Sequence, residues 1–107
     1  MVGWFKKKKE VNETALLLDG KLLTLVARRY VDENGNPQEE GLGRGGRIDT
    51  AHGHVILSTD KGEVFVNSDI SVVECAELMS KGGAIFTGVN ELTGQEETIV
   101  CYYTKRQ

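Results

Sequence analysis

The feature that most constrains the fold is the segment at residues 54–71. It holds two short runs of β-branched and aromatic residues, 55–57 and 64–66, on either side of the polar turn Asp60-Lys61-Gly62. Such runs flanking a turn that contains glycine are typical of a β-hairpin. We therefore predict that the chain is mainly β.

The length of the turn also predicts the register of this hairpin. A type I turn closed by a glycine in the left-handed conformation pairs Leu57 with Phe65 and Ile56 with Val66. Leu57 and Phe65 then share one face, while Ile56, Val64 and Val66 share the other. A hairpin exposed on one side would alternate apolar with polar residues, but here both faces are apolar. We expect the second face, formed by Ile56, Val64 and Val66, to be an interaction surface.

Turn-forming residues divide the N-terminal half of the chain. Asp19-Gly20 predicts a type I′ hairpin turn between strands at residues 15–18 and 22–31, with a bulge near Ala27. Residues 38–47 are polar and rich in glycine, which is typical of a surface loop. The G-x-G-x-x-G match at residues 41–46 lacks the preceding strand and following helix of a dinucleotide site, so we interpret it as a flexible connection.

Residues 70–78 fit two structures. A capping box formed by Ser71 and Glu74 predicts a helix, while the two valines between them favour a strand. We favour the strand, and the alternative is one short helix near residues 70–81.

Together these elements predict a mainly β fold, a small barrel or sandwich of six to seven short antiparallel strands, the last at residues 84–87 and 98–104. Residues 54–73 resemble the small SH3-like and Sm-like barrels, in which a hairpin is followed by a one-turn 3₁₀ segment and a final strand. The resemblance implies a topology and no function, because the segment lacks the Asn- and Gly-containing signatures with which Sm proteins contact RNA.

Charge is unevenly distributed along the 107 residues. The first ten carry a net charge of +3 and the remainder −6. This division predicts a flexible basic tail at residues 1–12 and a single small β domain at residues 13–107. No run approaches the roughly 20 apolar residues of a membrane-spanning helix, and no signal peptide is recognised, so we expect a cytoplasmic protein.

The basic tail has two interpretations. Aromatic side chains beside a lysine run are typical of a peripheral membrane contact, with rings at the lipid headgroups and lysines facing anionic lipid. The alternative is a flexible start that aids solubility. The candidate membrane contacts are Trp4, Phe5, Lys6, Lys7, Lys8 and Lys9.

Four arginines are candidates for a nucleic-acid-binding patch. They come together if the Gly-rich loop folds back on the second predicted strand. The acidic charge of the main part of the chain disfavours this function, because phosphate binding needs a basic face. The four residues are Arg28, Arg29, Arg44 and Arg47.

Metal and catalytic sites are less well supported. His52 and His54 would share one face of an extended segment, with Asp49 nearby, but a tetrahedral metal needs a further ligand that the sequence does not supply. We predict Cys75 and Cys101 to be small buried hydrophobic residues. Because no nucleophile and base occur in a recognisable pattern, we predict no enzymatic activity, no cofactor and no metal.

The sequence therefore favours a non-enzymatic interaction or assembly module that binds a protein partner or itself as a homo-oligomer. Two alternatives stay open: a small RNA- or nucleic-acid-binding barrel that uses the arginine patch and the Gly-rich loop, and a peripheral membrane-surface protein that uses the N-terminal tail.

Overall fold

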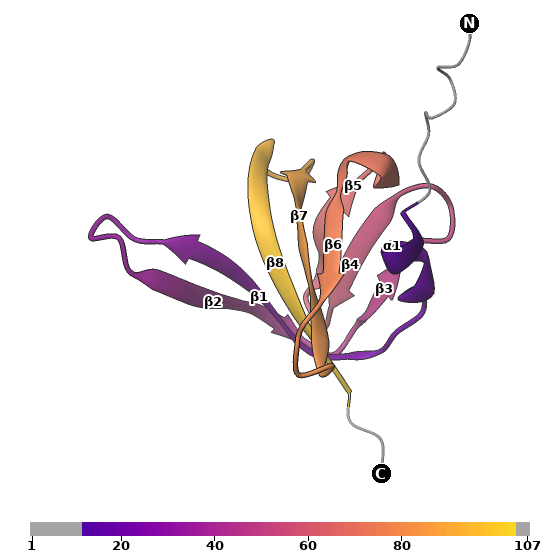
Figure 1. Cartoon of the computed structure of the whole chain (residues 1–107), viewed down its shortest axis with the longest axis horizontal. Coiled ribbons are helices and arrows are strands. Elements are labelled where there is room, and N and C mark those ends of the chain that lie inside the picture. Colours follow the sequence, from indigo (N-terminus) through magenta and orange to yellow (C-terminus); the bar gives the residue numbers. More distant parts are fainter. Residues whose placement is uncertain (1–11, 105–107) are drawn as a thin grey trace, which may run out of the picture.

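The computed structural model describes residues 12–104 of the chain. Its elements, drawn in Figure 1, are the helix α1 (Glu13–Leu17), the strands β1 (Leu23–Val31), β2 (Pro37–Arg44), β3 (Arg47–Asp49), β4 (Val55–Thr59) and β5 (Gly62–Asn67), the 3₁₀ turn η2 (Ile70–Val72), and the strands β6 (Glu74–Glu77), β7 (Gly83–Asn90) and β8 (Gln95–Tyr103).

The strands form two antiparallel sheets, so the mainly β prediction is confirmed. One sheet has five strands in the order β2-β1-β8-β7-β6, and the other has three in the order β3-β4-β5. Of the predicted barrel or sandwich, the barrel is wrong, because the sheets are not closed into one. Residues 12–104 form eight strands where six to seven were predicted. The hairpin β4–β5 is followed by η2 and β6, as in SH3-like barrels. However, β6 pairs with β7 of the other sheet, so the SH3-like or Sm-like topology is not confirmed.

A single hydrophobic core draws side chains from both sheets. Its largest fully buried members are Phe65 on β5 and Phe86 on β7. Ile48, Leu57 and Ile99 also have no exposed surface. Burial of such side chains contributes about 1.5–3 kcal/mol each, which makes this cluster the main stabilising feature of the fold.

The predicted hairpin is confirmed as β4 and β5. Leu57 pairs with Phe65 and Ile56 with Val66, as the turn predicted. Gly62 has the expected positive φ, +99°. The turn chemistry predicted these pairs, although the register shifts between Leu57 and Ser58, nearer the turn.

The hairpin predicted across Asp19-Gly20 is wrong, because its first arm is the helix α1. The Asn12 side chain caps this helix by accepting a hydrogen bond from the Ala15 N–H at 3.2 Å. Ala15 and Leu18 are buried while the two leucines between them are exposed, which is helical periodicity. Gly20 has a φ of +83° and follows the helix, so Asp-Gly here marks a helix end rather than a hairpin turn.

The loop predicted at residues 38–47 is also wrong, because most of it is the strand β2 paired with β1. Its side chains are polar because the strand lies at the edge of the sheet and is largely exposed. The bulge predicted near Ala27 is present as a register shift between Val26 and Ala27. The polar composition of β2 thus reflects exposure to solvent and not a lack of regular structure.

The base of β2 is fixed to the three-stranded sheet. The Arg44 N–H donates to the Asp60 carboxylate at 3.1 Å, and the Asp60 N–H donates to the Arg44 carbonyl at 2.8 Å. Close by, Gly46 has a φ of +85°, and a Cβ added there would collide with the backbone of Ser58. Glycine at position 46 therefore permits the β2–β3 connection to pass close to the backbone of β4.

Residues 70–78 hold the short 3₁₀ helix η2 followed by the strand β6. The favoured strand therefore occupies part of the segment, and the helix alternative near residues 70–81 is present only as the three residues of η2. The carboxylate of Asp69, and not Ser71, caps η2: it accepts a hydrogen bond from the Ser71 N–H at 3.1 Å.

A buried asparagine joins the two sheets at the β7–β8 turn. The Asn90 side chain, on a residue 1% exposed, donates to the Val64 carbonyl at 3.0 Å and accepts from the Val66 N–H at 3.2 Å. The same amide accepts from the Leu92 N–H at 3.1 Å and donates to the Glu97 carboxylate at 2.9 Å. These bonds satisfy backbone groups along the edge of β5.

Candidate interaction surface

The most exposed regular structure is the outer part of the β1–β2 hairpin. We call residues 28–40, which comprise the outer halves of both strands and the turn between them, the arm. The arm extends away from the other strands, at the left of Figure 1. Two of its large apolar side chains face solvent, Tyr30 at 46% exposure and Val31 at 66%. The arm therefore presents apolar surface on an element that projects from the core.

The arm projects because β1 separates from β8. Pairing between these strands ends at Arg29 and Thr98, whereas pairing between β1 and β2 continues to Val31 and Pro37. The separation leaves a cleft of about 560 Å³, lined by residues 28–30 of β1 and residues 95–98 of β8. Beyond Arg29, β1 pairs with no described strand other than β2.

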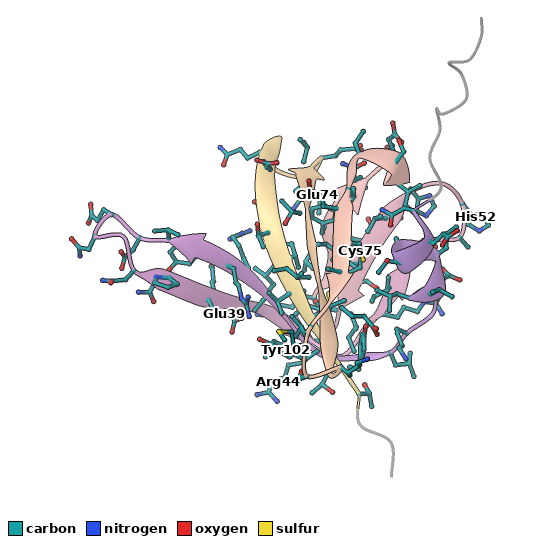
Figure 2. All side chains as sticks on the ribbon, in the orientation of Figure 1. Glu39, Arg44, His52, Glu74, Cys75 and Tyr102 are labelled. Atoms are coloured by element: carbon teal, nitrogen blue, oxygen red, sulfur yellow. The ribbon has the colours of Figure 1, made fainter. Side chains whose placement is uncertain are left out.

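Ion pairs across the two strands brace the root of the arm. Arg28 Nη1 lies 2.8 Å from Glu40 Oε1, and Arg29 Nε lies 3.1 Å from Glu39 Oε2. The Tyr102 hydroxyl on β8 donates to the Glu39 carboxylate at 3.0 Å, and Figure 2 shows these two residues together at the base of the arm. Opposite charges directly across a strand pair stabilise its register.

A hydrogen-bonded turn orders the tip of the arm. The Asp32 carboxylate accepts from the backbone N–H groups of Asn34 and Asn36, both at 2.9 Å, and from the Gln38 amide at 3.0 Å. Gly35 adopts a φ of +83°. These bonds hold the turn in one conformation, which lowers the entropy lost when it binds a partner.

The turn is expected to loosen in acid. Hydrogen bonds from the backbone N–H groups of Asn36 and Asn34 lower the pKa of Asp32 below its ordinary value of 3.8. Because the pKa is lowered in the folded turn, the ionised carboxylate stabilises the turn fully at pH values above the ordinary pKa. This stabilisation is lost as the pH falls through the lowered pKa. An NMR titration of the Asn34 and Asn36 amide signals should therefore show a midpoint below 3.8. An Asp32→Asn variant should lack this transition, and a midpoint at or above the ordinary value would contradict the assignment.

The four arginines of the predicted nucleic-acid patch have different surroundings. Arg28 and Arg29 are paired with glutamates in the arm, and Arg28 also lies 3.5 Å from Glu97. Arg44 and Arg47 are exposed and form no ion pair within residues 12–104. Figure 2 shows Arg44 pointing outward at the lower margin of the molecule. The positive charges of Arg28 and Arg29 are therefore neutralised by glutamates, whereas those of Arg44 and Arg47 are not neutralised within residues 12–104.

A second cleft lies at the base of the arm. It has a volume of about 430 Å³ and is lined by Leu25, Arg44, Asp60 and Lys61 together with two glycines of β2. Its charged residues are two cations and one anion, and Asp60 is already bound by the Arg44 backbone. We call this the base cleft, and it carries a net positive charge.

The predicted interaction face of the β4–β5 hairpin is half-buried. Ile56, Val64 and Val66 are each of intermediate exposure, and Val64 packs against the core. On the opposite face Leu57 and Phe65 are fully buried. The arm exposes more of its apolar side chains than this face does.

The histidines lie in the segment between β3 and β4. His54 Nε2 is 3.5 Å from Asp49 Oδ1, and the rings of His52 and His54 are 5.8 Å apart between their centres. Within residues 12–104, no three His, Cys, Asp or Glu side chains converge to hold a metal ion. His52 lies at the right margin of Figure 2, on the other side of the molecule from the arm.

Both cysteines are free thiols on strands of the larger sheet. Cys101 is buried and Cys75 half-buried, and burial raises the pKa of each thiol to about 12. A thiol with such a pKa is a poor nucleophile near neutral pH.

Two other predictions concern membranes. The candidate membrane contacts at residues 4–9 lie outside the described residues. Among residues 12–104 there is no helix of the length and hydrophobicity that a membrane span requires.

Sequence reasoning missed the arm, although a signal for it was present. Arg28-Arg29 and Glu39-Glu40 lie symmetrically about Asn34, so a hairpin centred there brings opposite charges together in both pairs. The glycine content of the following segment hid this pattern by favouring a loop.

Comparisons with protein-family models, with curated proteins and with solved structures found no match to this chain. The role of the arm therefore has to follow from its own residues and their surroundings.

Proposed function

We propose that the protein is a non-enzymatic interaction module, in which the arm is the element that binds a protein partner or a second copy of the chain. The observation that carries the proposal is the ordered arm with its exposed Tyr30 and Val31. Exposed apolar side chains on a projecting strand pair are typical of protein interfaces.

The energetics of hairpins support this function. A two-stranded hairpin without a covering layer is marginally stable in water, because it buries little apolar surface against a large loss of backbone entropy. The arm offsets this with the ion pairs of Arg28 and Arg29 and with the turn around Asp32. Polar contacts of this kind preserve an exposed shape, and a preorganised shape binds with less loss of entropy.

The chemistry of the described residues favours binding over catalysis. The thiols have raised pKa values, and the paired histidines lack a third convergent ligand within residues 12–104. Both clefts beside the arm are wide open to solvent and lined by charged residues, whereas small-molecule sites are mostly enclosed and apolar.

A photo-crosslinking experiment tests the proposal. A photoreactive amino acid replaces Val31 in the full chain, which is then irradiated in the cells that make the protein. The matched control places it at Val72, which has 62% exposure against 66% for Val31 but lies on η2. We expect a discrete protein adduct from Val31 and none of the same kind from Val72. Equal labelling from both positions, or none from Val31, would overturn the proposal.

A further inference from the structure

We infer that the arm binds a second copy of the chain, with the acidic turn of each arm seated in the base cleft of the other copy. This inference rests on the proposed function and names its partner. The inference depends on a separation of charge between the acidic turn at the tip of the arm and the positively charged base cleft at its root.

The tip is acidic and uncompensated. Residues 30–38 contain Asp32 and Glu33 and no basic residue. Glu33 is exposed and forms no ion pair within residues 12–104. The hydrogen bonds to Asp32 come from neutral amides, so its negative charge also remains. The exposed apolar residues Tyr30 and Val31 directly precede these two residues in the sequence.

The base cleft has the complementary character. Arg44 and Lys61 are exposed, and neither forms an ion pair within the described part of the chain. The third charged residue of the lining, Asp60, has one carboxylate oxygen engaged by the Arg44 N–H. The partly buried Leu25 and the glycines Gly41 and Gly43 provide a lining with little side-chain bulk. Such a surface accommodates a polar turn flanked by apolar side chains.

The ion pairs at the root of the arm explain why the arms pair in opposite directions. Glu39 and Glu40 neutralise the two arginines there, so the uncompensated charges lie at the tip of the arm and in the base cleft beyond its root. Two arms related by a two-fold axis perpendicular to them run antiparallel, and each acidic tip then meets the other copy's base cleft. A two-fold axis makes both contacts identical, so the distance from tip to base matches without adjustment. The assembly closes as a dimer.

Charge reversal provides the test. Glu33→Lys and Lys61→Glu are each introduced alone into the full chain, and self-association is followed by sedimentation equilibrium. In either variant residues 33 and 61 carry like charges at both contacts of the dimer, so we expect the dissociation constant to rise about tenfold or more. In an equimolar mixture the heterodimer has opposite charges on residues 33 and 61 at both contacts, and we expect association to recover toward that of the native chain. Glu74→Lys on β6, at the other edge of the sheet, makes the same change of charge and should leave association unchanged.

The outcomes separate this inference from the proposed function. A native chain that stays at 11.8 kDa at all concentrations, or a mixture that fails to recover, would overturn the dimer. If the native chain stays monomeric but the Val31 photo-adduct contains a different protein, the proposed interaction function stands and only the identity of the partner is wrong. If single-stranded RNA binds and Lys61→Glu abolishes that binding without affecting the mass, the base cleft is a phosphate site and the inference fails.

Discussion

Replacing Gly46 by alanine is expected to destabilise the fold by about 3 kcal/mol or more. Gly46 has a φ of +85°, and a Cβ there would collide with the carbonyl group of Ser58 and the Cα of Thr59. The obstructing atoms belong to the backbone of β4, so relief would require the β2–β3 connection to move away from that strand. Urea unfolding followed by circular dichroism measures the loss as a lower midpoint with an unchanged slope.

The adjacent Gly45 provides the control. It also has a left-handed φ, +67°, but no atom lies within 4 Å of an added Cβ. Gly45→Ala should therefore show only the cost of the left-handed conformation, about 1–2 kcal/mol. Equal losses in the two variants would mean that conformational strain, and not the close approach to β4, sets the requirement for glycine at position 46.

Replacing Asn90 by alanine is expected to lower the free energy of unfolding by about 3 kcal/mol or more, because several buried polar groups lose their partners at once. The amide makes four hydrogen bonds at 2.9–3.2 Å, two of them to the backbone of β5. Among these partners, the Val64 carbonyl and the Val66 N–H lie at a half-buried edge. Hydrogen exchange should show faster exchange at Val66 than in the native protein.

Asn34→Ala is the matched control for this variant. Asn34 lies in the exposed turn of the arm, and its backbone N–H, which alanine retains, makes the bond to Asp32. An exposed substitution of this kind usually changes stability by no more than about 0.5 kcal/mol. If Asn90→Ala unfolds at the same urea concentration as Asn34→Ala, the contacts at the β7–β8 turn do not hold the sheets together.

How much of the fold was predictable depended on whether local signals agreed. The β4–β5 hairpin was predictable because β-branched and aromatic residues flank the turn on both sides, and the turn chemistry gave the pairing of Leu57 with Phe65. Asp19-Gly20 was misread because the same dipeptide closes a hairpin and ends a helix. The deciding contact, the Gly20 N–H to the Ile48 carbonyl at 2.7 Å, comes from a distant part of the chain.

The candidate site was less predictable than the fold. Interfaces were sought where apolar residues cluster, which led to Ile56, Val64 and Val66, and these are half-buried. The arm contains only two large exposed apolar residues, Tyr30 and Val31. What distinguishes them is that β1 leaves β8 just before them, and the end of a strand pairing is a tertiary property that no local pattern encodes.

The pair of hydrogen bonds between Arg44 and Asp60 has a consequence for solubility at high protein concentration. An unpaired outer strand such as β2 can template the addition of further chains, and growth of that kind leads to fibrils. At one end of β2 the Asp60 side chain and backbone already occupy the N–H and carbonyl of Arg44, and at the other end Pro37 has no N–H to offer. Only a few residues of β2, between Pro37 and Arg44, remain open to pairing with another chain. Fibril growth by strand addition at β2 should therefore be disfavoured.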